Sequence, residues 1–565
     1  MFKQEIITLL SKETRLKPEE LDNLLEVPPN TDLGDYAFPC FILSKKEKKS
    51  PVEIAEQLTK NLSTKLPKEI QGLKAQGPYL NIFINKTQLA KKIIKINANY
   101  GKTNLGKKKK IAIDFSGPNI GKPMHIGHIR STIIGDSLMR IHSFLGYNAI
   151  GINYLGDIGL HIGKLIVAWE LWLNKDALKK DPVTELLRLY VKFCGKEKSE
   201  IKEGMEPTPE ELQENEWTIK AKEKLQLLEL GDKKANKIWD NIRKSSGKGF
   251  DKVYDMLDVE FTETTGQSYF AEKGKGIVTE AILGGHAKAE PSGAVFTEIN
   301  GTPKYILRSN KTASYMTYDL GAAVERFDKH NFHKMIYVTD YRQADHFKQL
   351  FYMLDLFGYE WADKLNHLGF GTINFGKEIM KTREGGVILL EDVLKKTIEK
   401  AAEGIKKRKT KGSPGKVGIG AIKYIVLKNE PSKDVNFSWE TALSFEGNTG
   451  PYLQYSYARA SSIIKKAKNF NKSATNLKEL TPQEIALLTA ISNFPEVVEQ
   501  AGHHLNPALI ANYAFDLAKK FSEFYTTCHV LKSDCEGFRL RLIDAFRTTL
   551  KNALYLLGIE VMEEM

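Results

Sequence analysis

The spacing of hydrophobic positions changes several times along the chain, and each change predicts a region of different structure. Near the N-terminus, apolar residues recur with helical spacing over 54–62 and alternate with period two over 79–85. A mixture of helices and strands predicts an α+β domain, which we place at residues 1–105. A lysine-rich stretch at 101–110 follows and is typical of a linker.

The next region alternates short apolar strands with amphipathic helices. Before residue 160 the pattern predicts a strand at 111–115, a helix at 124–145 and a strand at 148–155. Further on it predicts a strand at 334–340, a helix at 342–356 and a strand at 365–370. This order is typical of a parallel sheet, split here by a charged, helix-prone insertion at about 171–260. We expect a Rossmann-like domain over 106–395.

From about residue 451 the periodicity is helical almost throughout. The predicted helices cover 452–466, 482–500, 508–528 and 539–557. Their apolar faces predict an all-α helix bundle over 451–565. A connecting segment over 396–450 contains a basic loop at 406–416. The expected fold class is therefore a multidomain α/β protein, with an α+β domain before the Rossmann-like domain and a helix bundle after it.

Composition narrows the class of protein only slightly. A chain of 565 residues is too long for one core, and its net charge of +13 favours a polyanionic partner such as nucleic acid. Four cysteines, without zinc-ligand spacing, predict free thiols in a reducing compartment and no zinc site. No signal peptide and no run of about 18 apolar residues is apparent, so we expect no membrane span and a cytoplasmic protein.

Candidate chemistry concentrates where the strand at 111–115 leads into a helix. Residues 118–128 read Pro-Asn-Ile-Gly-Lys-Pro-Met-His-Ile-Gly-His. The pattern places His125 and His128 on the first turn of the helix, where backbone N–H groups and the helix dipole attract anions. Gly127 lets a flat ligand approach the backbone. We predict an ATP site; the alternative is a pair of surface histidines.

His125-Ile126-Gly127-His128 resembles the HIGH motif of class I aminoacyl-tRNA synthetases. The longer string at 114–123, Asp-Phe-Ser-Gly-Pro-Asn-Ile-Gly-Lys-Pro, resembles that of arginyl-tRNA synthetases of the bacterial type. Segments near both ends of the chain are also similar to that family, namely 34–37, 77–81, 446–455, 512–518 and 557–565. The resemblance implies a class I catalytic domain at 106–395, an N-terminal domain that meets the tRNA elbow, a stem-contacting segment at 396–450 and a C-terminal anticodon-binding bundle.

A second motif, residues 380–386, resembles a weakened KMSKS loop. Cations on such a loop can close over a triphosphate and stabilise charge as pyrophosphate leaves. Ile379 stands where the motif has its first lysine, and the resemblance implies that Lys122 substitutes for it, with Lys377 and Lys381 as alternatives. The implied catalytic residues are His125, His128 and Lys122. The implied ATP-binding residues are Pro118, Gly121, His125, Gly127, His128, Met380, Lys381 and Arg383.

The amino-acid pocket should contain carboxylates, because a guanidinium is a planar fork of donors. The resemblance implies an arginine-binding set made of Asp114, Asn119, Tyr315, Asp319 and Gln343. Asp114 stands where many relatives have glutamate, so its shorter arm leaves its contact open. Four of these side chains also have a structural interpretation: Asp114 and Gln343 as caps, Tyr315 and Asp319 as helix-surface residues.

The resemblance implies an arginine–tRNA ligase that uses L-arginine, ATP with Mg²⁺ and tRNA(Arg), without a tightly bound cofactor or zinc. It also implies that tRNA must bind before arginine is activated; for assembly we expect a monomer. Aromatic and amide side chains expected on tRNA are Tyr79, Asn81, Tyr452, Tyr455 and Tyr513, although core packing is the alternative for the three C-terminal tyrosines. Two rival functions are a class I synthetase for another amino acid, such as cysteine or glutamate, and a non-catalytic tRNA-binding paralogue. The acids around the pocket argue against an acidic substrate, the lack of zinc ligands against cysteine, and the two histidines with Arg383 against the paralogue.

Overall fold

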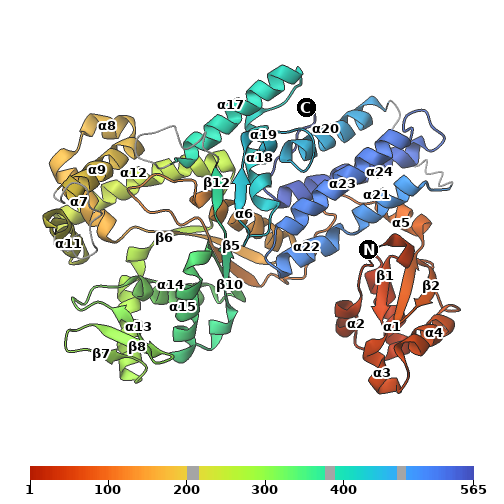
Figure 1. The fold of residues 1–565 in the computed structure, drawn as a ribbon, viewed down its shortest axis with the longest axis horizontal. Coiled ribbons are helices and arrows are strands. Elements are labelled where there is room, and N and C mark those ends of the chain that lie inside the picture. The colour runs from red at the N-terminus through yellow and green to blue at the C-terminus, as the bar shows by residue number, and fades with distance from the viewer. Residues whose placement is uncertain (29, 200–214, 376–387, 468–478) are drawn as a thin grey trace.

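The computed structural model describes residues 1–28, 30–199, 215–375, 388–467 and 479–565. Figure 1 shows an elongated molecule with the N-terminal domain at one end. The C-terminal helices lie beside that domain, and the central sheet separates them from the helical insertion and from the helices α13 (Ala271–Leu283) to α15 (Ala344–Leu356). None of the helices in these ranges is long and apolar enough to cross a membrane.

The N-terminal domain is a three-stranded antiparallel sheet covered by helices, as its pattern predicts. The sheet has the order β1-β3-β2, with β1 at Tyr36–Pro39, β2 at Ile70–Gln76 and β3 at Tyr79–Ile84. Its helices are α1 (Lys3–Thr14), α2 (Pro18–Leu24), α3 (Phe41–Glu47), α4 (Pro51–Leu62) and α5 (Lys86–Ile93), with a 3₁₀ turn η1 at Thr31–Leu33. α4 begins at a capping box, in which Ser50 and Glu53 bond each other's backbone N–H groups.

The central sheet has five parallel strands in the order β11-β10-β4-β5-β6. The strands are β4 (Lys110–Asp114), β5 (Asn148–Leu155), β6 (Glu263–Gly266), β10 (Lys334–Asp340) and β11 (Leu365–Phe370). β4 reads as an unbroken apolar run because both its faces are covered: Ile111 and Ile113 join one core, and Ala112 joins another. The predicted Rossmann-like α/β arrangement is confirmed, and β6 adds an unpredicted edge strand.

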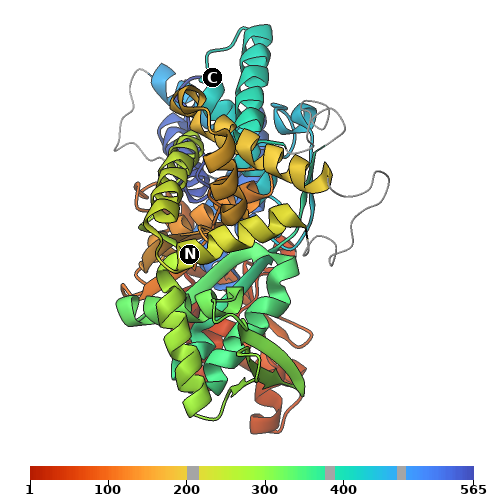
Figure 2. The same ribbon diagram turned by 90° about the vertical axis from the view of Figure 1, so that its left-hand side faces the viewer.

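Helices surround this sheet and also form the insertion. The insertion consists of α7 (Leu160–Trp172), α8 (Lys175–Lys180), α9 (Pro182–Ser199), α11 (Glu216–Glu229) and α12 (Lys233–Leu257). After β6 come η2 (Gln267–Phe270), α13 (Ala271–Leu283), the small sheet of β7 (Lys288–Ala289), β8 (Val295–Ile299) and β9 (Thr302–Leu307), then α14 (Tyr315–His330), η3 (Tyr341–Gln343), α15 (Ala344–Leu356) and η4 (Glu360–Lys364). Figure 2 shows the insertion helices between this group and α17 (Leu390–Arg408).

The helix α6 that follows β4 begins at His128 and ends at Phe144, four residues later than its predicted start. Residues 124–126 instead pair with another segment, with an isolated antiparallel bridge between His125 and Leu389. Leu390 N–H donates to the Met124 carbonyl at 2.9 Å, and Ile126 N–H donates to the Ile388 carbonyl at 3.2 Å. The prediction that both histidines lie on the first helical turn is therefore wrong for His125, which precedes the helix.

The C-terminal third is helical, as predicted, apart from a short parallel pair of strands, β12 (Ile373–Phe375) and β13 (Val435–Phe437). Its helices are α17 (Leu390–Arg408), α18 (Pro414–Leu427), α19 (Trp439–Ala442), α20 (Gly450–Lys466), α21 (Pro482–Ser492), α22 (Phe494–His503), α23 (Ala508–Thr527) and α24 (Glu536–Leu556). The predicted helix at 482–500 is two helices, because Pro495 lacks the N–H that would continue α21. The predicted basic loop at 406–416 is shorter in the structure, at 409–413, because α17 extends to Arg408 and α18 begins at Pro414.

The middle of α6 is bonded to the C-terminal end of α24. Ser137 donates its hydroxyl hydrogen to the Leu556 carbonyl at 2.7 Å, and this contact is buried. Lys423 of α18 donates to the Gly558 carbonyl at 2.7 Å and faces Asp136 of α6 at 3.9 Å. α6 thus joins the central sheet to the C-terminal helices.

Candidate active site

A cavity of about 370 Å³ lies at the carboxyl ends of the parallel strands, where ligands bind in open α/β sheets. Its lining includes the ends of β4, β5, β10 and β11 and the turn before α6. Among the predicted site residues, it brings together Asp114, Asn119, His125, Gly127, His128, Asp319 and Gln343. Segments more than 200 residues apart in sequence therefore share one chamber.

The two histidine rings contact each other at the start of α6, with their planes tilted by 44°. Their ring centroids are 4.0 Å apart. Gly127 N–H donates to Nδ1 of His125 at 3.1 Å. The backbone N–H of His125 donates to Nδ1 of His128, also at 3.1 Å. Each ring therefore leaves Nε2 for a ligand. Burial lowers the pKa of His128 to about 3 and also lowers the pKa of His125, so both rings are neutral donors near pH 7.

The turn between β4 and α6 is held by backbone contacts with β5. Ile120 N–H donates to the Gly156 carbonyl, and Gly156 N–H donates to the Pro118 carbonyl, both at 3.1 Å. A Cβ on Gly156 would lie 1.8 Å from Oδ1 of Asn119, so only glycine fits there. The neighbouring Asp157 bonds the Ser268 N–H and hydroxyl, at 2.8 and 2.7 Å. The segment 153–159 is therefore a structural turn that places Asn119.

Lys122, Pro118 and Gly121 lie outside the lining of this cavity. Lys122 turns toward the insertion, where its Nζ lies 4.5 Å from the ring centroid of Tyr190 in α9. A Cβ on Gly121 would lie 2.0 Å from Leu165 of α7, so that glycine allows the insertion to approach closely. The contacts of these residues explain their place in the fold, and their predicted roles toward ATP stay predictions.

The two acids of the pocket have different partners. Asp114 is 7% exposed, and its Oδ2 lies 2.8 Å from Nη1 of Arg326, a buried residue of α14. Asp319, also on α14, accepts from Nε2 of His346 at 2.6 Å. Burial raises the pKa of Asp114 to about 6, against the opposing charge of Arg326. This geometry does not support Asp114 as the main partner of a guanidinium, because it already holds one.

Sequence reasoning missed both Arg326 and His346, although a spacing signal exists for each. Arg326 follows Asp319 by seven residues on the same helix, which places them on one face. His346 follows Gln343 by three residues at the start of α15. Tyr315, in contrast, is 59% exposed at the N-terminus of α14, near Gly159 and outside the cavity lining.

The predicted loop residues Met380, Lys381 and Arg383, with Lys377 and Ile379, lie outside the described residues. Both flanks of this loop are attached to the segment that carries the histidines. On one side, Leu390 and Ile388 pair with 124–126. On the other, the buried Arg130 donates to the carbonyls of Lys433 at 2.6 Å, Pro431 at 3.0 Å and Thr372 at 3.4 Å. The described residues on either side of the second motif therefore contact the segment that carries the first.

The side chains predicted to contact tRNA differ in exposure. Tyr513 donates its hydroxyl hydrogen to the Ala490 carbonyl at 2.9 Å and stacks on Phe494, and Asn81 is 4% exposed. The core-packing alternative therefore fits Tyr513, and burial argues against a tRNA contact for Asn81. Tyr455 is 38% exposed. Two others make edge contacts and stay partly exposed: Tyr79 against Phe41 and Tyr452 against Phe515.

Within the described ranges, no group of three His, Cys, Asp or Glu side chains is arranged to hold a metal ion. A parallel sheet with two histidines at its first strand-to-helix turn, split by a helical insertion, defines the catalytic domain of a class I aminoacyl-tRNA synthetase. Residues 90–439 match the family described as tRNA synthetases class I (R), catalytic domain. Residues 453–565 match the DALR anticodon binding domain, and residues 1–84 match the arginyl tRNA synthetase N terminal domain. The chain belongs to the arginyl-tRNA synthetase family.

Individual relatives agree over the full length. Arginine–tRNA ligases of Clostridium beijerinckii and Clostridium botulinum are 38% identical to this chain over 579 and 580 residues, and each alignment covers 100% of both chains. The solved arginyl-tRNA synthetase of Thermus thermophilus has a TM-score of 0.82 at 24% identity, covering 100% of both chains. That of Plasmodium falciparum has a TM-score of 0.78 at 24% identity, covering 100% of this chain and 99% of its own. The two structures support the fold.

Proposed function

We propose that this chain carries out the reaction for which its family is named, joining L-arginine to tRNA(Arg) with ATP. The observation that carries the proposal is one cavity that contains both the paired histidines and a reachable carboxylate, Asp319. The histidines suit phosphate, and the carboxylate suits a guanidinium. Charging of total tRNA with each amino acid in turn tests the proposal: arginine alone should be attached, and attachment of another amino acid, or of none, would overturn it.

In the first step, the arginine carboxylate attacks the α-phosphorus of ATP. A new P–O bond forms as the bond to pyrophosphate breaks, so the products are arginyl-adenylate and pyrophosphate. The carboxylate is already a nucleophile, so no general base is needed. Catalysis then depends on positioning and on charge stabilisation, with Nε2 of His125 and His128 donating to phosphate oxygens. Mg²⁺ is proposed to enter with ATP, held mainly by phosphate oxygens and water.

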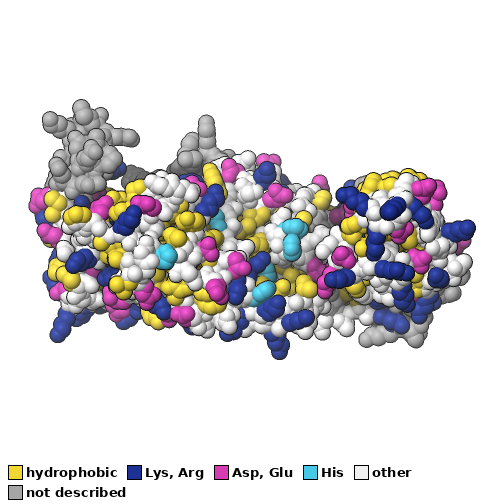
Figure 3. Space-filling view, turned by 90° about the horizontal axis from the view of Figure 1, so that it is seen from below, with side chains coloured by type: hydrophobic (Ala, Val, Ile, Leu, Met, Phe, Trp, Pro, Cys, Tyr) yellow, Lys and Arg dark blue, Asp and Glu magenta, His cyan; other side chains and the backbone are white. Residues whose placement is uncertain are grey.

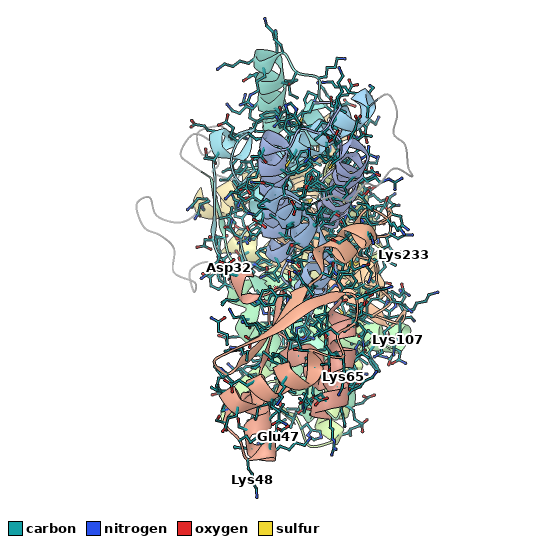
Figure 4. The ribbon with its side chains drawn as sticks, turned by 90° about the vertical axis from the view of Figure 1, so that its right-hand side faces the viewer. Asp32, Glu47, Lys48, Lys65, Lys107 and Lys233 are labelled. Atoms are coloured by element: carbon teal, nitrogen blue, oxygen red, sulfur yellow. The ribbon has the colours of Figure 1, made fainter. Side chains whose placement is uncertain are left out.

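In the second step, a ribose hydroxyl of the terminal adenosine of tRNA attacks the adenylate, and AMP leaves. We propose that the remaining domains bind the body of the tRNA. We also propose that the protein acts as a monomer. The N-terminal domain has four exposed lysines around the end of α3, at Lys45, Lys46, Lys48 and Lys49. Figure 3 shows Lys and Arg side chains gathered over this domain, and Figure 4 shows Lys48 projecting from its tip. These cations suit an RNA backbone.

Asp319→Asn is expected to raise the arginine KM by about 10- to 100-fold, because a hydrogen bond to a charged partner is worth about 1.5–3 kcal/mol. ATP–pyrophosphate exchange in the presence of tRNA measures this KM. Asp340→Asn is the matched control: Asp340 lines the same cavity but is already engaged by Arg342 at 2.7 Å, so its KM should change less than about threefold. An unchanged arginine KM in Asp319→Asn would remove that residue from the pocket.

A further inference from the structure

His346 is a titratable side chain at the cavity that the mechanism above does not use. It lies on the first turn of α15, and its Nε2 is 2.6 Å from Oδ2 of Asp319 on α14. Asp319 lines the cavity and His346 contacts Asp319 from outside that lining; their side chains remain 18% and 30% exposed. Its position beside the carboxylate proposed to receive arginine makes it a candidate for a role in recognition.

The imidazole is held by its own helix and by the sheet beneath it. Its ring meets Phe347 edge-on at 5.5 Å, and Phe347 stacks on His367 of β11 at 4.7 Å. His367 in turn is bonded to the hydroxyl of Thr339 at 2.8 Å. The stack ties the start of α15 to β10 and β11. A fixed imidazole can hold a carboxylate in one orientation, whereas a free carboxylate would lose rotational freedom on binding.

The two acids of the pocket, Asp114 and Asp319, differ in whether their negative charge is neutralised. The charge of Asp114 is cancelled by Arg326, and this pair is buried. Asp319 with a neutral His346 leaves one net negative charge, which matches one guanidinium. A protonated His346 would cancel that charge and place a second cation beside a cationic substrate. The pocket is therefore attractive to arginine when His346 is neutral.

We propose that His346 is a positioning residue for arginine recognition: its Nε2–H donates to Oδ2 of Asp319 and turns the other carboxylate oxygen toward the guanidinium. This rests on the proposed function, because it assigns a partner to the carboxylate that receives the substrate. The role is exerted through Asp319 and not on ATP. Loss of His346 should therefore raise the arginine KM and leave the ATP KM and kcat nearly unchanged.

The same pair gives arginine binding a pH dependence. Burial lowers the pKa of His346, but the hydrogen bond and charge of Asp319 outweigh it and raise the pKa above 6.5. Protons and arginine compete at this pair, so the arginine KM falls as the pH rises through the pKa of His346. The other titratable groups nearby are His367 on β11, whose pKa burial lowers, and Asp340 with Arg342, which neutralise each other at 2.7 Å.

The test measures KM for arginine and ATP, and kcat, for the full chain with tRNA between about pH 6 and 9, a range around the ordinary histidine pKa. In His346→Leu, we expect the arginine KM to rise about tenfold, the effect of losing about 1.4 kcal/mol, with the ATP KM and kcat within about twofold. In His346→Gln, the amide NH₂ replaces the Nε2 donor, so the KM should recover to within about threefold while its fall with pH disappears. His330→Gln is the matched control, since His330 pairs with Glu263 at 3.2 Å on another face of the domain.

Three results would overturn the proposal. They are an unchanged arginine KM in His346→Leu, an equal rise in the ATP KM, or a pH dependence of KM that persists in His346→Gln. The last variant keeps the donor, so it tests the role even where leucine prevents folding. Wild-type charging with arginine separates the two hypotheses: if it occurs and these variants fail to respond, only the role of His346 is rejected, and if it does not occur, the proposed function fails.

Discussion

Replacing Arg326 with methionine is expected to destabilise the catalytic domain by about 3–5 kcal/mol, the loss typical when one partner of a buried ion pair is removed. Arg326 and Asp114 have side chains only 3% and 9% exposed. The guanidinium lies 4.6 Å from the ring centroid of Tyr154 and 5.9 Å from that of Phe270, so methionine keeps much of the packing but leaves the carboxylate without a counterion. Thermal unfolding of the full chain, followed at the transition of this domain, measures the loss.

The loss should depend on pH in a defined direction. Without Arg326, the pKa of Asp114 in the folded state rises further above its unfolded value, and such a group stabilises the fold at low pH and ceases to do so as pH rises through the folded pKa. The loss in free energy of unfolding of Arg326→Met relative to the wild type should therefore grow from about pH 5 to pH 8, since the pKa of Asp114 in the wild type is already raised to about 6. Asp114→Asn combined with Arg326→Met should recover most of the stability.

Arg243→Met is the matched control for this substitution. Arg243 pairs with Asp240 at 3.4 Å on the surface of α12, where the side chains are 51% and 37% exposed. Surface pairs contribute about 0–1 kcal/mol, so this variant should unfold close to the wild type. Equal unfolding temperatures for the Arg326 and Arg243 variants would show that the buried pair carries no special share of the stability.

Changing His128 to alanine is expected to lower the rate of arginine activation by about 10²- to 10³-fold, the usual cost of removing a preorganised donor from a developing charge. The ring contributes Nε2 to the cavity while its Nδ1 is occupied by the backbone of His125. Because the main chain of α6 continues unchanged, unfolding should shift little. ATP–pyrophosphate exchange with saturating tRNA measures the rate.

His333→Ala provides the comparison for that variant, since His333 is exposed just before β10 and should be replaceable without loss. Near-normal exchange in the His128 variant would contradict its role in the phosphate site. A large loss of folded protein would contradict it differently, by showing that the ring acts through stability. Measuring exchange and unfolding on the same samples separates these outcomes.

Much of the fold follows from local pattern. The strands at 148–155, 334–340 and 365–370 have the predicted bounds, and in β10 the buried apolar run at 335–338 marks the strand directly. β6 could not be predicted in this way, since its sequence Glu-Thr-Thr-Gly carries no apolar signal at the sheet edge. The start of α6 was misplaced because residues 124–126 pair with a segment about 260 residues away, which periodicity cannot detect.

The residues of the site also fall into two groups: those that the local sequence locates and those whose contacts depend on tertiary packing. The histidines and Asn119 could be located because their motif is contiguous and the turn that holds it is local. The Asp114–Arg326 pair depends on how α14 packs against β4, and the orientation of Lys122 depends on a helix of the insertion. The resemblance to a family identifies which positions belong to the site. Tertiary packing decides which side chain each charged residue contacts there.

Helix α6 is attached to other parts of the chain at its first turn and again at its middle. At about 1.5 Å per residue, the nine residue steps from His128 to Ser137 rise roughly 14 Å between the histidines and the bond to the Leu556 carbonyl. If the C-terminal segment shifts relative to the sheet, one of two things must happen. Either the buried hydrogen bonds to the Leu556 and Gly558 carbonyls break, or α6 moves with the segment and displaces His128 at the proposed phosphate site. A fusion tag or deletion at the last residues would then act on catalysis from a distance, with no contact to either substrate.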